Sequence, residues 1–502
     1  MRTRISGGWV ISHRNGKHRL DAGHEVVFEG DAILYVGPKF EGHIDRDIDA
    51  RGKLVSPGFI DTHVHSGHRA SHRLISDSGR GDYFGQPFFE ISVPKEGTRI
   101  LGDVRYLRPQ ETGMEAELEL HALFTVAELL RNGVTTFVEY GSQLRIQEAL
   151  MTQCLALGVR AYLGPGYDSG RWVGDEHGRL KRVLNEENGR NEFAGAVKWI
   201  ERHDGAGGGL IKGILVPREM ETCSLDLLRM TREKADEMKL PMATHAAYSI
   251  IEFYEVVREY RKTPIEMLSD LDMLRPTLNI GHGNLPADSV RLNYPAAQDL
   301  KLMGEAGVSI SHCPINIVRR ARVLDNWQRY TELGINIALG SDTYPRDMML
   351  NMRTASYHGK VMSHNYKSAT AADVFSAATL GGAKSLGRDD LGRLSAGARA
   401  DIILIDLSGN GTLRMGPVRD PIKTVVECGV GDDVDTAIVA GVIRMENKRI
   451  AGQDLDAIRR RAQEAGERVW NNWHTSDPLG RTHEETCPWS FCPASYRDGE
   501  VE

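Results

Sequence analysis

Two histidines, His63 and His65, stand one residue apart at the end of an apolar run that extends from Leu54 to Ile60. Successive side chains of a β-strand alternate between its two faces, so residues i and i+2 point the same way. The two imidazoles are therefore expected to converge on one point just beyond a buried strand. Zinc and similar ions bind neutral imidazoles, and two of these supply half of a metal site. The alternative is a surface strand that ends in two unrelated histidines.

Four further residues of these chemical types follow apolar, strand-like segments later in the chain. They are His245, His282, His312 and Asp342. Each stands at the carboxyl end of its segment, which is the end that carries the active site in parallel α/β barrels. Histidines that pack in the core account for one or two such positions, but not for all six. We therefore expect the six residues to share one face of the fold.

The elements that must position these residues are eight apolar segments that alternate with amphipathic helical segments. Such alternation indicates a parallel sheet covered on both faces. Eight units predict an α/β fold, a (β/α)8 TIM barrel whose active site lies at the carboxyl ends of the strands. The predicted strands are the run before His63 and residues 135–141, 160–166, 210–216, 241–245, 278–282, 308–312 and 335–342. The predicted helices are residues 117–132, 143–157, 191–203, 225–239, 250–261, 296–306 and 327–333.

Segments rich in β-formers flank this α/β part at both ends of the chain. Residues 1–55 hold short strand patterns separated by turn residues, and similar patterns return in residues 391–450. We expect these two stretches to form one small β-sandwich domain beside a barrel that spans residues 56–390. Residues 451–502 are predicted to form a C-terminal helix and a tail. A long insertion after the first strand, residues 66–116, is expected to act as a lid or a substrate wall.

The composition favours a globular protein that acts on a small molecule. The chain is 41% hydrophobic, and its net charge of −7 is mild for 502 residues, which gives no reason to expect a nucleic acid or an anionic membrane as partner. No stretch approaches the ~18 apolar residues that a membrane span needs. Six cysteines are too few for a disulfide framework. The first residues lack the apolar core of a signal peptide, so we predict a cytoplasmic protein.

The motif Pro57-Gly-Phe-Ile-Asp-Thr-His63-Val-His65 resembles the amidohydrolase superfamily, together with His245, His282-Gly, His312-Cys-Pro and Gly-Ser-Asp342. The similarity is to the branch that contains cytosine and S-adenosylhomocysteine deaminases and the atrazine and triazine hydrolases. The stretches that end at Asp401 and Gly441 are similar to the small β-sandwich of the same family.

The resemblance implies one divalent metal ion held by His63, His65, His245 and Asp342, with His282 beside it to orient or polarise the substrate. Zinc is the favoured metal, and iron, cobalt or manganese would also suit such ligands. An ion of this kind lowers the pKa of a water molecule toward ~7 for attack on an sp² carbon. Asp342 would take up the proton and pass it to the leaving nitrogen. Relatives are often dimers or larger, so a homo-oligomer is expected by analogy.

Two positions depart from the pattern of the deaminases in this branch. Those enzymes carry a glutamate three residues after the strand-five histidine, where this chain has Tyr248, and a histidine after strand four, where this chain has Arg218. Glu252 lies one helical turn further on and would substitute only if the chain were rearranged. Arg218, Tyr248 and His312 are candidate substrate contacts. For Arg218 and Tyr248 the alternative is a salt-bridged or packed wall residue.

The leading prediction is a metal-dependent hydrolase that cleaves a non-peptide C–N bond of a small molecule, of the amide, urea or carbamate type. Phenylurea and thiocarbamate hydrolases are similar relatives of that kind. The alternative is a deaminase or dechlorinase of an amino- or chloro-substituted N-heterocycle. A remote alternative is a non-catalytic scaffold on the same fold, which would have lost metal ligands that this chain keeps. Binuclear relatives use a carboxylated lysine on strand four, but for Lys212 a position facing the helices or solvent is favoured.

Overall fold

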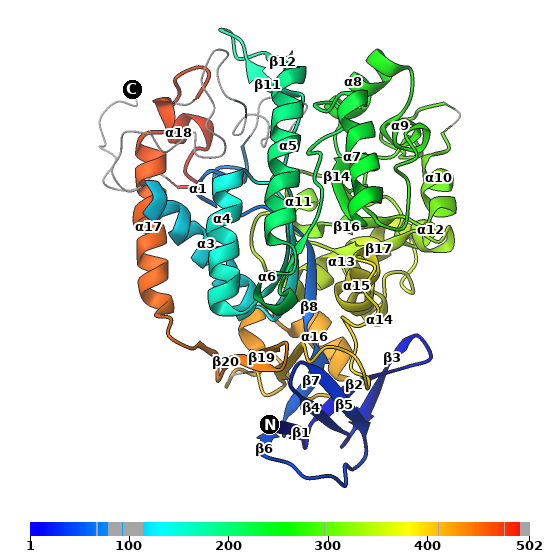
Figure 1. The fold of residues 1–502 in the computed structure, drawn as a ribbon, viewed down its shortest axis with the longest axis vertical. Helices are drawn as coiled ribbons and strands as arrows, with labels where there is room; N and C mark the ends of the chain where they lie inside the picture. Colours follow the sequence, from blue (N-terminus) through cyan, green and yellow to red (C-terminus); the bar gives the residue numbers. More distant parts are fainter. Residues whose placement is uncertain are drawn as a thin grey trace.

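The structure, a computed structural model, describes residues 1–66, 69–78, 93, 114–295, 297–409, 411–475 and 477–491. It is an α/β protein in which helices surround a central group of strands, with a smaller all-β part at one end (Figure 1). The predicted lid, residues 66–116, falls mostly outside the described residues, and so does the tail beyond residue 491.

Eight parallel strands form the centre of the larger part. One sheet has the order β13–β10–β9–β8 and the other the order β14–β15–β16–β17. Parallel bridges join the two sheets at both edges: Leu215, just beyond β13, pairs with Met242, and Val64 pairs with Asp342. The strands therefore follow one another in a closed ring. Their bounds are β8 Phe59–Val64, β9 Val134–Glu139, β10 Arg160–Leu163, β13 Ile211–Gly213, β14 Met242–Ala246, β15 Leu278–His282, β16 Ser309–His312 and β17 Asn336–Leu339.

The ring strands are buried because both of their faces are covered. Every residue of β8, β9, β14 and β15 is buried, which accounts for the near-continuous apolar runs in the sequence. Figure 1 shows α3, α4, α5, α7 and α8 arranged around the strands. All seven predicted helices are present, within a few residues of their expected ends. The helix bounds are α3 Met114–Arg131, α4 Leu144–Leu157, α5 Glu186–His203, α7 Leu225–Met238, α8 Ile250–Tyr260, α10 Asp299–Ala306, α11 Pro314–Arg319, α12 Trp327–Glu332, α13 Met348–Ser363, α14 Ala371–Ser376 and α15 Gly382–Ser385.

Strands from both ends of the chain pair with each other in the smaller part. One sheet has the order β5–β4–β1–β6 and the other the order β21–β20–β19–β18–β7–β2–β3. Apolar residues of both sheets, among them Val26, Ile33 and Ile402, form one buried cluster. The bounds are β1 Arg2–Ser6, β2 Trp9–Arg14, β3 Lys17–Ala22, β4 Glu25–Glu29, β5 Ala32–Gly37, β6 Arg46–Asp49, β7 Lys53–Pro57, β18 Ile402–Asp406, β19 Val434–Val439, β20 Val442–Glu446 and β21 Arg449–Ile450.

The apolar run before His63 is divided between the two parts at Gly58. Pro57 pairs with Ile402 of β18, whereas Phe59 pairs with Val134 of β9. A Cβ atom at position 58 would lie 2.1 Å from Oγ1 of Thr135, so only glycine fits at this crossing. One continuous run of sequence thus supplies strands to two different sheets.

The C-terminal helix α17 (Leu455–Asn471) lies along α3 (Figure 1). An ion pair of 2.6 Å joins Arg468 to Glu117 of α3. Trp470 Nε1 donates to the carbonyl oxygen of Ala70 at 3.0 Å, and Trp473 is buried against the same stretch of chain. The end of the chain therefore holds the segment that follows His65.

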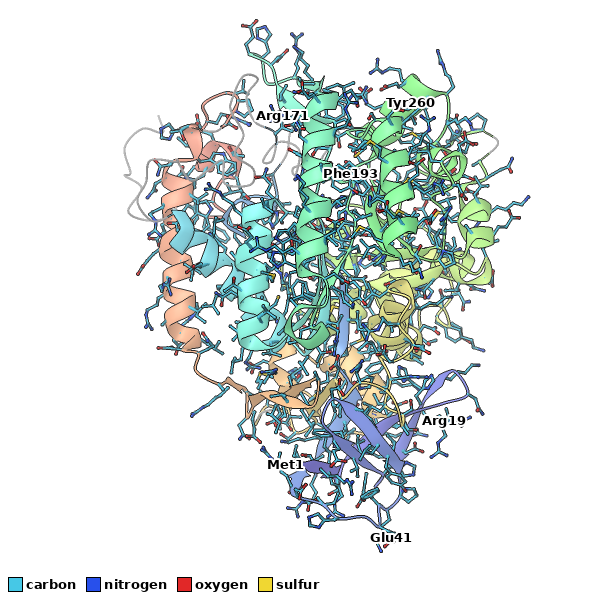
Figure 2. All side chains as sticks on the ribbon, viewed as in Figure 1. Met1, Arg19, Glu41, Arg171, Phe193 and Tyr260 are labelled. Atoms are coloured by element: carbon cyan, nitrogen blue, oxygen red, sulfur yellow. The ribbon has the colours of Figure 1, made fainter. Side chains whose placement is uncertain are left out.

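The side chains separate into a buried core and a charged exterior. In Figure 2, Phe193 of α5 lies within the molecule, where its ring packs edge-on against Tyr167 at 5.2 Å, whereas Arg19, Glu41 and Arg171 are exposed. Among the described residues, no helix is both long enough and apolar enough to cross a membrane.

Candidate metal centre

Four ring-strand ends bring histidines and one carboxylate to a single point. Nε2 of His65 lies 3.2 Å from Nε2 of His63 and 3.2 Å from Nε2 of His245. The carboxylate of Asp342 lies 3.7 Å from Nε2 of His65 and, through its other oxygen, 3.7 Å from Nε2 of His282. His63 of β8 and His65, just beyond it, do converge, as their i and i+2 spacing predicts, and the closing bridge between Val64 and Asp342 places the carboxylate beside them.

These donor atoms suit a divalent cation. The nitrogens and oxygens of His63, His65 and Asp342, and those of His63, His245 and His282, lie within 4.8 Å of one another in each group. Burial lowers the pKa of His245 to about 4 and keeps those of His63 and His282 well below their ordinary value. Their imidazoles are therefore neutral near pH 7 and can offer a lone pair to a metal.

Two glycines make the room that the imidazoles occupy. A Cβ atom at Gly281 would lie 2.9 Å from Cε1 of His63 and 3.2 Å from Cδ2 of His245. A Cβ atom at Gly340 would lie 2.5 Å from Cβ of His63. All three contacts are shorter than the ~3.5 Å at which carbon atoms normally meet. The rings thus reach their common point only because the neighbouring strands carry no side chain there.

A second layer of groups fixes the orientation of the donors. Nδ1 of His245 lies 2.8 Å from the carbonyl oxygen of Arg218, so that Nε2 is left to face the cluster. The ring of His63 stacks on Tyr140, with centroids 3.7 Å apart. The buried Asp61 accepts hydrogen bonds from the amides of His63 and Ser341. These supports would hold the donors in place for an ion.

Arg346 ties the loop after β17 to the other side of the cluster. This arginine is 1% exposed, pairs with Glu128 of α3 at 2.8 Å and donates to the carbonyl oxygen of His65 at 2.6 Å. The sequence did not identify Asp61, Tyr140 or Arg346 as residues of the site, because nothing in their local pattern separates them from other buried residues.

Two of the cluster residues adopt an unusual backbone conformation. His282 has φ +68° and Asp342 has φ +60°, in the left-handed region that residues other than glycine seldom occupy. Such conformations cost of order 1–3 kcal/mol and persist where the surrounding structure imposes them, which is common at functional sites. His282 ends β15 and Asp342 lies three residues beyond β17, and with these backbone conformations the two side chains meet at 3.7 Å.

Burial also shifts the pKa of Asp342, the carboxyl group of the cluster. It raises the pKa of Asp342 to about 6, against the opposing influence of Arg320 and Arg319. These arginines belong to a basic stretch, Arg319, Arg320 and Arg322, that sequence analysis did not single out. Arg319 also stacks over Tyr344, with its guanidinium carbon 4.1 Å from the ring centroid. The wall beside Asp342 is therefore positively charged.

Tyr248 lies at the cluster. Its ring centroid is 5.7 Å from that of His245 and 6.1 Å from that of His282. Its hydroxyl donates to Oε1 of Glu221 at 2.6 Å. The same oxygen accepts a bond of 3.3 Å from Nε1 of Trp172, which belongs to an unpredicted hairpin of β11 (Gly170–Gly174) and β12 (Leu180–Leu184).

Glu252 does not reach the cluster. Its buried carboxylate accepts hydrogen bonds of 2.8 Å from the amides of Ala247 and Tyr248 and one of 3.2 Å from the amide of Ser249. It caps the start of α8 and holds the loop that carries Tyr248. The chain shows none of the rearrangement that would let Glu252 replace the missing glutamate.

Two predicted substrate contacts have other surroundings. The guanidinium of Arg218 pairs with Asp168 and donates to the carbonyl oxygen of Gly141 at 2.9 Å, so Arg218 is a salt-bridged wall residue that contributes its carbonyl oxygen to His245. His312 is not brought to the cluster. Its ring faces Trp327 of α12, 6.1 Å away, and lines a small cavity with His358.

His312 does not reach the cluster because alternate residues of a strand face opposite sides of the sheet. Ser311, the preceding residue of β16, points into the ring, where its hydroxyl contacts Thr62 and Asn279. His312 therefore points outward to the helices. Lys212, for its part, pairs with Asp204 at 3.5 Å and is about a third exposed, which places it away from the histidines, as favoured from the sequence.

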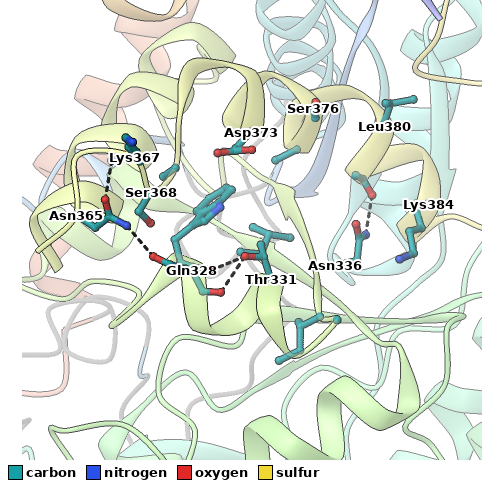
Figure 3. Close-up of a pocket in the computed structure, with 17 residues that line it drawn as sticks. Gln328, Thr331, Asn336, Asn365, Lys367, Ser368, Asp373, Ser376, Leu380 and Lys384 are labelled. Carbon is teal, nitrogen blue, oxygen red and sulfur yellow. Dashed lines mark hydrogen bonds between the residues drawn. The ribbon is translucent and has the colours of Figure 1, made fainter. Parts of the chain in front are cut away.

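A separate open pocket lies at the opposite end of the ring, beside Asn336 at the start of β17 (Figure 3). Several of its polar groups bond to one another or to the backbone. Asn336 donates to the carbonyl oxygen of Gly381, and Asn365 donates to Gln328, both at 2.9 Å. None of the candidate metal or substrate residues lines this pocket.

The fold and the histidine–aspartate cluster define a hydrolase of the metal-dependent kind. A model of the amidohydrolase family matches residues 54–444. The chain therefore belongs to the amidohydrolase family.

Curated relatives match over nearly their full length. A 5-methylthioadenosine/S-adenosylhomocysteine deaminase of Pyrococcus abyssi is 28% identical over 459 residues, which are 90% of this chain and 96% of the relative. A 5'-deoxyadenosine deaminase of Methanosarcina mazei is 26% identical and covers 88% of this chain and 93% of its own.

Solved structures share the fold. An adenosine deaminase of Xanthomonas campestris with bound zinc has a TM-score of 0.75 at 20% identity, covering 93% of this chain and 98% of its own. An atrazine chlorohydrolase of Arthrobacter aurescens complexed with zinc has a TM-score of 0.77 at 21% identity, covering 92% of this chain and 100% of its own.

Proposed function

We propose that His63, His65, His245 and Asp342 hold one divalent metal ion, with zinc as the favoured metal. The convergence of their donor atoms supports this assignment. The ion would lower the pKa of a water molecule and polarise the bond to be cleaved. Asp342 would accept the proton of the water, because its carboxylate lies among the proposed ligands, where the water would be bound. His282, 3.7 Å from Asp342, would hold the substrate's polar group.

The proposed architecture is a (β/α)8 TIM barrel over residues 56–390 with a β-sandwich built by residues 1–55 and 391–450. The closed ring of eight strands and the pairing of β18 with β7 support this division. Gly58, where the chain crosses from β7 to β8, lies within three residues of the proposed boundary between the two parts. Residues 451–502 would form a C-terminal extension.

We propose a substrate with a carbonyl C–N bond, that is an amide, a urea or a carbamate. The observation that carries this choice is the neighbourhood of His245: Tyr248 stands three residues after it, at the sequence position where deaminases of the branch carry a glutamate, and the carboxylate of Glu252 is engaged by three amides. Hydrolysis of a carbonyl C–N bond needs no carboxylate aimed at a ring nitrogen. Asp342 can move the proton of the water by itself.

A deaminase of an amino-substituted N-heterocycle is the second candidate. It is favoured by the names of the curated relatives, which are deaminases of adenosine derivatives. The remote alternative of a non-catalytic scaffold is disfavoured, because all four proposed ligands are present and three of them lie within 3.7 Å of Nε2 of the fourth, His65. A homo-oligomer in the cytoplasm stays a prediction.

The test is a mass-spectrometric product screen of the purified, zinc-supplemented protein. Aryl ureas, carbamates and amides form one half of the panel, and amino- and chloro-substituted triazines, pyrimidines and purines form the other. Release of a free amine from the first half supports the proposal, whereas loss of ammonia or chloride from the second half favours the alternative. Asp342→Ala is the control, and it is expected to lose both the bound metal and the turnover.

A further inference from the structure

One buried pair beside the cluster has no role in the scheme above. Tyr248 and Glu221 share a hydrogen bond of 2.6 Å, and Glu221 is 2% exposed. The second oxygen of Glu221, Oε2, is buried, and the described residues offer it no hydrogen-bond partner. A buried carboxylate oxygen without a partner is costly, so its presence beside the cluster calls for an explanation.

We propose that Tyr248 donates a proton to the nitrogen that leaves the substrate, and that Glu221 positions the Tyr248 hydroxyl and stores the proton that replaces it. This inference rests on the proposed function. In the deaminases of the branch, a glutamate after the strand-five histidine is the proton shuttle. Here the Tyr248–Glu221 pair would take that role, with the carboxylate supplied by the loop after β13.

The placement of the two residues carries the argument. Tyr248 follows β14 by two residues, and its ring centroid lies within 6.1 Å of those of both His245 and His282, so its ring borders the cluster. Glu221 approaches from the other side of Tyr248 and is held by Trp172 Nε1 at 3.3 Å. The pair therefore connects the cluster to a carboxyl group that does not touch the proposed ligands.

The surroundings of Glu221 favour a stored proton. Burial and the nearby Glu219 raise the pKa of Glu221 to about 7, while Tyr248 and Trp172 bond to it. Glu252 is the other acidic group that faces the pair, and its charge interacts with Glu221. Trp172 also packs in an apolar cluster with Ile251 and Leu180, which keeps water from the side chains around the pair.

The proton balance of the step is simple. Water adds its hydroxyl to the carbonyl carbon and gives a proton to Asp342. The C–N bond breaks with its electron pair on nitrogen, which takes the Tyr248 proton. Glu221 returns a proton to the Tyr248 oxygen. Asp342 then releases its proton, Glu221 takes one up, and the net change is one water added across the C–N bond.

The test uses the zinc-loaded protein and a series of carbamates with one acyl part and different leaving amines. The amines run from nitroaniline, which leaves readily without a proton, to an alkylamine, which does not. Tyr248→Phe is expected to lower kcat by about 10²- to 10⁴-fold for the alkylamine, the usual range for general acid catalysis, and by far less for nitroaniline. Glu221→Gln keeps an acceptor for the Tyr248 hydroxyl but cannot store a proton, so a smaller loss with the same trend is expected.

Tyr357→Phe is the matched control. Tyr357 donates to Glu427 at the same distance of 2.6 Å, but on the outer side of α13. It is expected to leave kcat unchanged for every amine in the series. Metal content is measured for each variant, and one ion per chain is expected throughout, which shows that the proposed ligands remain in place.

A second readout does not depend on turnover. Infrared difference spectra between the wild-type metal-free protein and Glu221→Gln are expected to contain the carbonyl band of a protonated carboxyl group at neutral pH, and the band should vanish as the pH rises. Absence of the band would overturn the proton-storing role of Glu221.

The kinetic outcomes separate the two proposals. An equal loss of kcat across the series in Tyr248→Phe would mean that the hydroxyl serves the carbonyl oxygen, and it would refute proton donation to nitrogen. A wild-type protein that loads zinc and releases no amine from this series, or from the ureas and amides of the product screen, would refute the proposed substrate class. The infrared spectra would then decide on the Tyr248–Glu221 pair by themselves.

Discussion

Gly281→Ala tests whether the missing side chain of β15 is what allows the imidazoles to converge. The added Cβ atom would lie 2.8 Å from Cε1 of Tyr140, 2.9 Å from Cε1 of His63 and 3.2 Å from Cδ2 of His245. Carbon atoms normally meet at ~3.5 Å, so the first two rings must each withdraw by roughly 0.6 Å or more. His63 cannot retreat freely, because it is stacked on Tyr140, which is pressed by the same atom.

The expected effect is loss of metal affinity and of turnover, with a moderate loss of stability. Overpacking of a core by one methyl group typically costs about 1–3 kcal/mol. A catalytic group misplaced by ~1 Å can lose about 10²-fold in rate. We therefore expect Gly281→Ala to fold, to bind zinc more weakly and to lose activity by one to two orders of magnitude. The assays are a zinc titration of the metal-free protein, chemical unfolding and kcat/KM on a substrate from the screen.

Gly195→Ala is the matched control for this substitution. Gly195 lies in α5, and a Cβ atom there has no neighbour within 4 Å. Replacing glycine by alanine inside a helix is expected to stabilise the protein by about 0.5–1 kcal/mol and to leave zinc affinity unchanged. Wild-type zinc affinity and kcat/KM in Gly281→Ala would refute the reasoning, because they would show that the cluster tolerates a side chain in its midst.

Two further predictions concern histidines away from the cluster. His312→Asn is expected to lower the free energy of unfolding by roughly 1–3 kcal/mol, because the ring packs against Trp327, and to leave zinc content and KM unchanged; loss of zinc would restore His312 to the site. His18 is partly buried, with Nε2 2.9 Å from Oγ1 of Thr379, and this burial lowers its pKa to about 4 from an unfolded value of 6.5. Its contribution is therefore complete above pH 6.5 and is lost as the pH falls toward 4, by about 3 kcal/mol in total. His18→Gln should unfold with a flatter pH dependence between pH 7 and 4.5 in denaturant titrations, and an unchanged slope would contradict this.

The sequence by itself determined that strands alternate with helices in the larger part of the protein. It also determined which chemical groups, imidazoles and a carboxylate, are available for the cluster. Strands buried on both faces must be apolar along their length, and helices that cover them must be amphipathic, so both patterns are visible without a structure. The spacing of His63 and His65 was informative for the same reason, because two residues apart on a strand means one face.

Strand-end orientation could not be read in the same way for His282 and His312. Each is the last residue of its strand, and each has the opposite parity to an inward-facing neighbour, Gly281 or Ser311. His282 is turned into the ring by its left-handed backbone, whereas the backbone of His312 has no positive φ and its side chain stays outside. That difference lies in one dihedral angle, which residue type and spacing do not specify.

Only the tertiary structure decided which distant residues meet. Glu221 lies 27 residues from Tyr248 and bonds to it because β13 and β14 are neighbours in the ring. Arg346 reaches His65 across 281 residues because β17 closes on β8. A local pattern records which face a side chain occupies, but contacts between strands far apart in sequence depend on how the ring closes, and that is a property of the whole chain.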